Sequence, residues 1–104
     1  MDNLNKVFDS QPGSVIKMKA NPGKGSALLT LTTKLFAMSE AIDRWLIFKD
    51  DADPDTLWFF ETFKNEDAVL RHQENRAVQE GHDEVMALLA EPPLHVAVHT
   101  VATN

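Results

Sequence analysis

The chain has 104 residues and no cysteine, with ten Lys and Arg against sixteen Asp and Glu, which gives a formal net charge of −6. This length fits one domain. The acidic balance argues against nucleic acid or an anionic membrane as a partner, and the lack of cysteine excludes disulfides and thiolate metal sites. No apolar run approaches the length of a membrane span. The first 13 residues lack the basic and apolar regions of a secretory signal, so we expect a cytoplasmic protein.

The amino-terminal part predicts an arm, a strand and a helix. Residues 1–13 contain few apolar side chains and end in a Gln-Pro-Gly turn signal, so we expect an N-terminal arm before a domain at residues 14–104. Residues 14–20 alternate in polarity, which indicates a half-buried strand. Asn21 is a candidate helix cap before a helix at residues 26–39, where leucines keep a helical spacing.

The middle of the chain predicts two strands and a partner chain. Residues 42–49 form the second strand, and an acidic turn with proline leads to a third strand at residues 56–64. Both faces of that third strand are apolar, with Leu57, Phe59 and Phe63 on one face and Trp58 and Phe60 on the other. One layer of helices covers only one face, so a second sheet from a homodimer is expected to cover the other.

The carboxyl-terminal part predicts a helical region and a last strand. Asn65 is the expected cap of a helix that extends towards residue 89, with a kink or a division into two segments at Gly81. Polar residues occupy the inward stripe of this helix. Since buried polar groups need partners or a wet cavity, we expect a pocket between helix and sheet. A last strand at residues 94–103 completes the ferredoxin-like βαββαβ order of an α+β protein with an antiparallel sheet.

One stretch resembles a known family. The run Glu61-x-Phe63-x-Asn65-x-x-Ala68-x-x-x-His72 is similar to the signature of the antibiotic biosynthesis monooxygenase (ABM) family. The resemblance implies a dimeric α+β barrel built from ferredoxin-like monomers. It also implies cofactor-independent oxygenation of a quinol, anthrone-like or other hydroxyaromatic small molecule, with molecular oxygen as co-substrate.

The resemblance and the inward stripe suggest a set of site residues. We expect His72 to act as base or anion partner and Glu61 to orient it. We expect the substrate to be bound by Asn75 and His82 as polar lining, and by Phe63 and Phe59 as apolar wall. In the structural alternative, His72 and Glu61 share a buried hydrogen bond that only ties the helix to the sheet.

Other functions remain open. The same acid–base pair would serve an isomerase or lyase acting on a small carbonyl compound, and the fold would also suit a non-catalytic ligand-binding stress protein. The spacing from Phe63 to His82 resembles that of haem-degrading relatives. Those relatives carry tryptophan at the strand position and an asparagine on the first strand, and this chain has neither. His95 and His99 share a face of the last strand, but no carboxylate is assigned beside them, so no metal site is predicted.

Overall fold

A computed structural model describes residues 10–103. In chain order its elements are β1 (Pro12–Lys19), α2 (Gly25–Met38), β2 (Ile42–Lys49), β3 (Thr56–Phe63), α3 (Glu66–Glu74), α4 (Arg76–Ala87) and β4 (Leu94–His99). The strands form one antiparallel sheet in the order β2-β3-β1-β4. This confirms the predicted ferredoxin-like α+β fold. None of the helices in this described region has the length and apolar character needed to cross a membrane.

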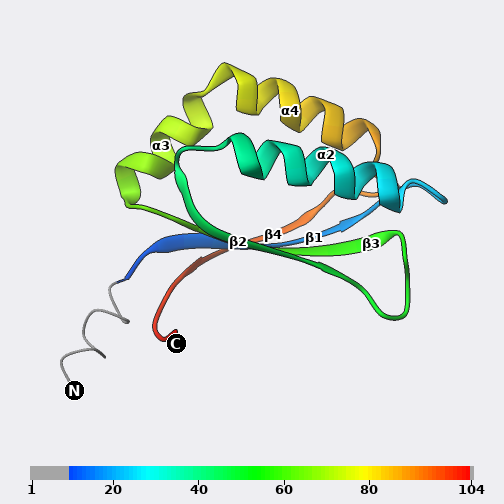
Figure 1. Ribbon diagram of the computed structural model, residues 1–104, viewed down its shortest axis with the longest axis horizontal. Coiled ribbons are helices and arrows are strands. Elements are labelled where there is room, and N and C mark those ends of the chain that lie inside the picture. Colours follow the sequence, from blue (N-terminus) through cyan, green and yellow to red (C-terminus); the bar gives the residue numbers. More distant parts are fainter. Residues whose placement is uncertain (1–9, 104) are drawn as a thin grey trace.

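All three helices lie on one side of the sheet, and the other side is open (Figure 1). The helix-covered face contains the core, in which Leu28, Leu57 and Phe59 are almost completely buried. A smaller cluster of Ile42, Phe63 and Ala68 lies near the start of α3. The alternation of β3 therefore places Leu57, Phe59 and Phe63, which were predicted to share a face, under the helices.

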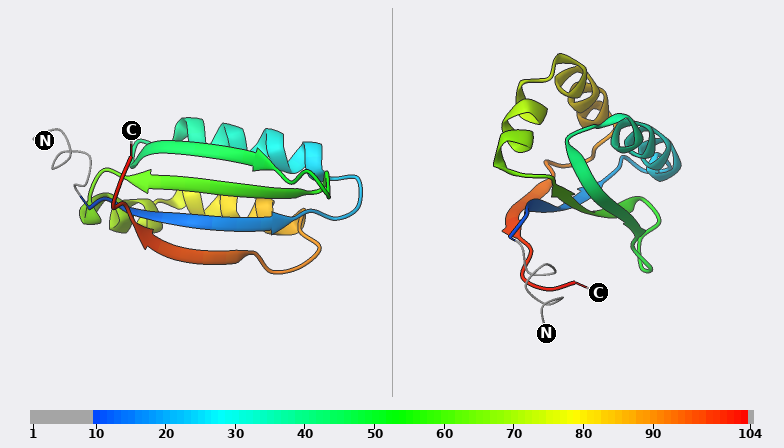
Figure 2. Two further views of the ribbon diagram at one scale, coloured as in Figure 1. Left: turned by 90° about the horizontal axis from the view of Figure 1, so that it is seen from below. Right: turned by 60° about the vertical axis from the view of Figure 1, so that its left-hand side comes forward.

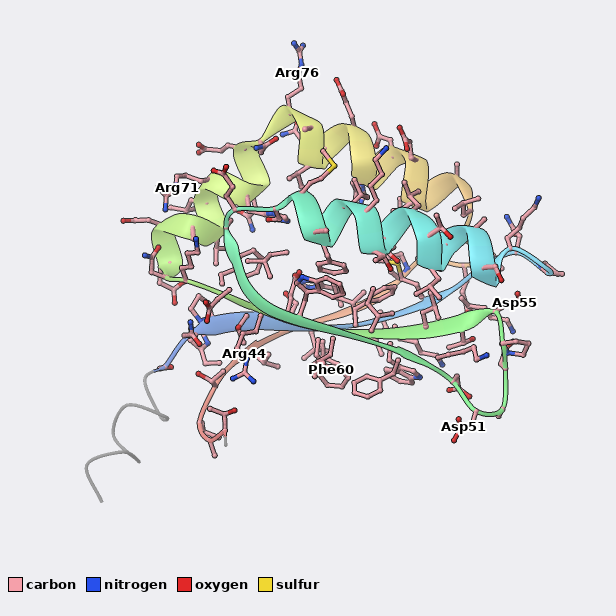
Figure 3. All side chains as sticks on the ribbon, in the orientation of Figure 1. Arg44, Asp51, Asp55, Phe60, Arg71 and Arg76 are labelled. Carbon is pink, nitrogen blue, oxygen red and sulfur yellow. The ribbon has the colours of Figure 1, made fainter. Side chains whose placement is uncertain are left out.

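The open face carries large apolar side chains that no other part of residues 10–103 covers. Phe60 projects from it, away from the helices (Figure 3). The strand register places Leu46 opposite Phe60 and Phe48 opposite Trp58 on this face, and Phe48 packs edge-on against Phe60 with ring centroids 5.5 Å apart. Exposed fractions run from 40% for Phe60 to 60% for Leu46, with Phe48, Leu94 and Val96 between them.

Strand β1 begins earlier than the sequence predicts. The Pro12-Gly13 pair forms its first two residues rather than a turn, so the strand overlaps the predicted arm, and residues 1–9 of that arm lie outside the described residues. Proline is tolerated at the first position of a strand. Gly13 is required there because a Cβ atom would lie 2.3 Å from the carbonyl oxygen of Glu61. The close approach of β1 to β3 thus depends on this glycine.

Helix α2 is capped from another part of the chain. Asn21 was predicted to cap it, but Asn21 accepts a backbone hydrogen bond from Lys24 (2.8 Å) across a turn in which Gly23 has a φ of 78°. Pro and Gly suit the two central positions of such a turn. The carboxylate of Asp55, in the β2–β3 loop, accepts hydrogen bonds from the amides of Gly23 and Gly25 at 3.1 and 3.0 Å. Asp55 thereby ties the start of α2 to the sheet.

The helical region after β3 divides at Asn75, not at Gly81. Asn75 has extended backbone angles, and its side-chain oxygen accepts hydrogen bonds from the amides of Ala77 and Val78, which caps α4. Gly81 is inside α4, where a Cβ atom would lie 2.6 Å from Leu35. The glycine is therefore the point where α4 packs closely on α2. The last strand also ends earlier than predicted, at His99.

Candidate active site

A cavity of about 740 Å³ lies between the helix-covered face of the sheet and the three helices. Its wall includes residues from β1, α2, β3, α3, α4 and the α2–β2 loop. Its polar and charged lining includes Ser39, Glu40, Glu61, Lys64, Arg71, His72, Asn75 and His82, and apolar lining comes from residues such as Ile16, Met18, Leu35, Phe36 and Val85. Such a mixture of apolar walls and a few polar groups is typical of a small-molecule site.

Glu61 is the buried acid of this cavity. It is only 9% exposed, because β3 is an inner strand and its side chain points under the helices. Burial disfavours the carboxylate and raises the pKa of Glu61 to about 7, although a hydrogen bond with Ser14 counters part of this shift. A carboxyl group with this pKa can both accept and release a proton near neutral pH.

His72 enters the cavity from α3 and is half-buried. Burial lowers the pKa of His72, so the ring is held neutral at neutral pH. Its Nδ1 atom lies 3.4 Å from the Ser39 hydroxyl, and its ring packs edge-on against Phe63 with centroids 5.1 Å apart. Ser39 and Phe63 therefore set the position of the imidazole.

The predicted hydrogen bond between Glu61 and His72 is not found. Both side chains line the same cavity, but Glu61 bonds to Ser14 and His72 to Ser39. The sequence places the two residues on a strand and on the helix that follows it, which does not fix the distance between their side chains. Ser39, which precedes β2, takes the orienting role that was predicted for Glu61.

The other predicted lining residues separate into two groups. Asn75 and His82 line the cavity, but the side-chain oxygen of Asn75 caps α4, and the His82 side chain is 64% exposed and 3.9 Å from Asp83. Phe59 and Phe63 lie behind the wall and not in it, since Phe59 is covered by Phe36 of α2 and Phe63 by the ring of His72. Phe36 lines the cavity in their place.

The sequence profile of the family described as antibiotic biosynthesis monooxygenase matches residues 13–84, from the start of β1 into α4. The chain belongs to the ABM family. Solved structures agree with this fold. A candidate antibiotic biosynthesis monooxygenase from Chloroflexus aurantiacus J-10-fl superposes with a TM-score of 0.80 at 22% identity, covering 91% of this chain and 97% of the other.

Two further structures have the same architecture. A candidate antibiotic biosynthesis monooxygenase from Caulobacter crescentus CB15 has a TM-score of 0.74 at 17% identity, covering 97% and 99% of the two chains. A variant of SnoaB from Streptomyces nogalater, described as a cofactor-independent oxygenase, has a TM-score of 0.73 at 14% identity, covering 89% and 95%. At these identities the likeness establishes the fold alone. None of the curated proteins matches this chain.

The ABM signature residues of this chain hold the β3–α3 connection. Asn65 caps α3 as predicted, because its side-chain oxygen accepts a hydrogen bond of 2.8 Å from the amide of Ala68. Ala68 is fully buried against Ile42 and Phe63. This packing orients α3 and thereby brings His72 to the cavity. The signature therefore determines the fold of the segment that carries the site.

The sequence did not indicate several polar residues at this cavity, namely Ser39, Lys64 and Arg71, which line it, and Ser14, which bonds to Glu61. Ser14 is separated from Glu61 by 47 positions, yet the two are directly paired across β1 and β3. Alternation along β1 places Ser14 on the same face as Ile16. The missing information is the strand register, which local sequence does not supply.

The two histidines of β4 have separate partners. His95 lies 3.0 Å from the Ser14 hydroxyl, and His99 lies 2.9 Å from a carboxylate oxygen of Glu66. Among residues 10–103, no cluster of three or more His, Asp or Glu side chains is arranged to hold a metal ion.

Proposed function

We propose that this protein is a cofactor-independent monooxygenase that acts on a quinol, an anthrone-like compound or another small hydroxyaromatic molecule in the cytoplasm. One observation carries the proposal: a buried carboxyl group with a pKa of about 7 and a neutral imidazole line the same largely apolar cavity. This combination suits proton removal from a weakly acidic hydroxyl group and retention of the resulting anion.

In this mechanism Glu61 accepts the proton of the substrate. A carboxylate whose pKa is raised to about 7 is a stronger base than an ordinary glutamate. His72 has a lowered pKa and is the weaker base of the two. We assign it the role of anion partner: when the Ser39 hydroxyl donates to Nδ1, the proton of the neutral ring is on Nε2, which then donates to the substrate oxygen.

The substrate anion supplies the electrons for the reaction with oxygen. A ring carbon of the anion forms a bond to O2, the resulting peroxide takes up a proton, and its O–O bond breaks. One oxygen atom stays on the product as a new carbonyl group and the other leaves as water with the two hydrogens of the former CH2 group. This conversion removes four electrons from the substrate, and they reduce both atoms of O2. Arg71 and Lys64 at the cavity wall favour a bound anion electrostatically.

The described chemistry of SnoaB supports an oxygenase without a cofactor, since SnoaB has the same fold and is described as a cofactor-independent oxygenase. The walls of the cavity supply the remaining requirement, which is limited access of water to a reactive anion. Residues Ile16, Leu35 and Phe36 provide this apolar wall from β1 and α2.

We also propose that the protein works as a homodimer, in which the open faces of two sheets pack together. Five large apolar side chains on this face are 40% to 60% exposed. The Thr62 hydroxyl, from the same side of β3, is buried without a hydrogen-bond partner in the described part of the chain. An apolar surface of this kind marks an interaction site, and a second copy offers a surface of the same shape and polarity.

Oxygen uptake tests the proposed activity. The substrates are a small panel of naphthohydroquinones and anthrones, with autoxidation subtracted. We expect saturable uptake by the wild type, and a decrease of about 10²- to 10⁴-fold in Glu61→Gln, the range that a positioned proton acceptor contributes. His72→Ala should show a smaller decrease. Substrate conversion without oxygen uptake would instead indicate the isomerase alternative, and binding without conversion would indicate a ligand-binding protein.

The haem alternative has its own test. In a titration with haemin we expect no saturable shift of the Soret band. A shift that is lost in His82→Ala would replace the oxygenase proposal with a haem-binding one.

A further inference from the structure

Three polar side chains form a continuous line across the sheet. Ser14 is 5% exposed and lies between Glu61 on β3 and His95 on β4. Its hydroxyl bonds to the Glu61 carboxyl group and lies 3.0 Å from Nε2 of His95. The line begins at a residue that lines the cavity and ends at an exposed histidine.

The strand register builds this line. β1 lies between β3 and β4, and the three strands are seen side by side in Figure 2. Ser14 is the direct partner of Glu61, and His95 is the direct partner of Ile16, two residues further along β1. Because paired residues point to the same face, all three side chains lie on the helix-covered side.

We propose that Ser14 and His95 form a proton relay that carries the proton taken up by Glu61 out of the cavity to the solvent. This inference rests on the proposed function, since it needs a reaction that delivers a proton to Glu61. A bound substrate fills the cavity and separates Glu61 from water that enters by the same route. The line through Ser14 leads instead along the helix-covered face of the sheet, from Glu61 on β3 to the exposed His95 on β4.

The relay moves one proton from the substrate to the solvent in each turnover. After the substrate O–H has given its proton to Glu61, the carboxyl O–H bond breaks and its proton forms a bond to the Ser14 oxygen. The hydroxyl proton of Ser14 moves at the same time to Nε2 of His95, which becomes an imidazolium. His95 then releases a proton to water. Ser14 is left with the proton that came from Glu61 and donates to the carboxylate, and its hydroxyl rotates towards His95 when Glu61 is next protonated.

Other charged groups around Glu61 do not offer an equivalent exit. Glu40, Lys64, Arg71, His72 and His82 share its cavity. None of them is hydrogen bonded to Glu61, whereas Ser14 is its direct partner across β1 and β3. The relay therefore takes Ser14 as the group that receives the proton of Glu61.

The first experiment needs no substrate. The ring signals of His95 are followed by NMR through a pH titration of the wild type, Ser14→Ala and Glu61→Gln. We expect the His95 signal of the wild type to show a step at the ionisation of Glu61, and both variants to lack this step. His99, on the same strand but bonded to Glu66, is the control and should show no such step in any of the three proteins.

The second experiment follows turnover. In weak buffer, His95→Ala should lower kcat by about tenfold to a hundredfold, the lower part of the range for a positioned proton-transfer group, while KM stays near the wild-type value. Added imidazole should restore kcat, because His95 is exposed and a small base can take its place. The first turnover after mixing should keep its wild-type rate. His99→Ala is the matched control and should behave as the wild type, whereas Ser14→Ala should be slow without rescue.

The outcomes separate the relay from the proposed function. A missing step in the wild-type His95 titration overturns the relay, whatever the activity. A His95→Ala kcat equal to the wild type in weak buffer, or one lowered without rescue by imidazole, also overturns it. If the wild type consumes no oxygen with any substrate, the proposed function fails, and the titration alone then decides whether Glu61 and His95 are connected.

Discussion

The two faces of the sheet differ in what they do with polar and apolar side chains. On the helix-covered face, Ser14, Glu61 and His95 are polar residues with partners, set among buried apolar side chains. On the open face, Leu46 and Phe60 are large apolar residues that are exposed. The helix-covered face thus places polar side chains beside the hydrophobic core, and the open face exposes large apolar side chains to solvent.

This contrast separates the two tasks of a small domain. A buried carboxyl group destabilises the fold in its ionised form, and it is retained where its altered pKa serves chemistry. An exposed apolar face also destabilises an isolated monomer in water, and it is retained where association covers it. We therefore assign the chemistry to the covered face and assembly to the open face.

The largest expected effect is on assembly. Leu46→Asp on the open face should weaken the dimer by about 4 kcal/mol, or roughly a thousandfold in Kd, because the twofold arrangement buries the new charge twice. Leu70→Asp is the matched control, since Leu70 is similarly exposed (55% against 60%) but lies on α3. Sedimentation velocity over a range of concentrations measures both. A wild type that sediments as a monomer at micromolar concentration contradicts the assignment of the open face.

The next effect is on the pH dependence of the unfolding free energy, which Glu61 on the covered face controls. The folded pKa of Glu61, about 7, lies above its ordinary value of 4.5, so between these values the folded protein holds a proton that the unfolded chain has released. Stability therefore falls as the pH rises through this window, by up to about 3 kcal/mol. Glu61→Gln removes this loss and should be more stable than the wild type at about pH 8 by this amount, with little difference at about pH 4.

Urea denaturation at the two pH values measures this difference. Glu84→Gln, an exposed substitution on α4, is the control and should leave the unfolding free energy unchanged at both. If Glu61→Gln has the same stability as the wild type at both pH values, the carboxyl group is not buried as described.

A smaller effect concerns the attachment of α2, which covers part of the sheet. Asp55→Ala removes the two hydrogen bonds to the start of α2 and should lower the unfolding free energy by about 1–2 kcal/mol. Asp51→Ala, at the tip of the same hairpin (Figure 3), should change it by less than about 0.5 kcal/mol. Equal losses in the two variants would show that Asp55 does not act as a cap. Thermal or urea unfolding measures both.

Much of the fold could be predicted from local patterns. The alternation of β3 identified its two apolar faces, and Asn65 was correctly predicted as the cap of α3, because both signals depend on neighbouring residues. Asn75 shows the limit of this reasoning. Its inward position suggested a pocket residue, and it does line the cavity. The helical period did not show that its side chain also accepts hydrogen bonds from the amides that follow it, which ends one helix and begins the next.

The candidate site could be predicted only in part. Glu61 and His72 were correctly placed at one cavity by the strand and helix periods. Their hydrogen-bond partners could not be found, because Ser14 meets Glu61 only through the pairing of β1 with β3, and Ser39 lies 33 positions before His72. Such contacts depend on the register of the whole sheet and leave no local signal.

The fate of the oxygen atoms tests most directly whether this cavity catalyses a monooxygenation. The purified protein is treated with a chelator, incubated with an anthrone under ¹⁸O2, and the product is analysed by mass spectrometry. We expect one ¹⁸O atom in each new carbonyl group, with the second atom in water, and loss of this labelling in Glu61→Gln. Product that forms at the wild-type rate but carries no ¹⁸O would contradict a monooxygenase at this cavity.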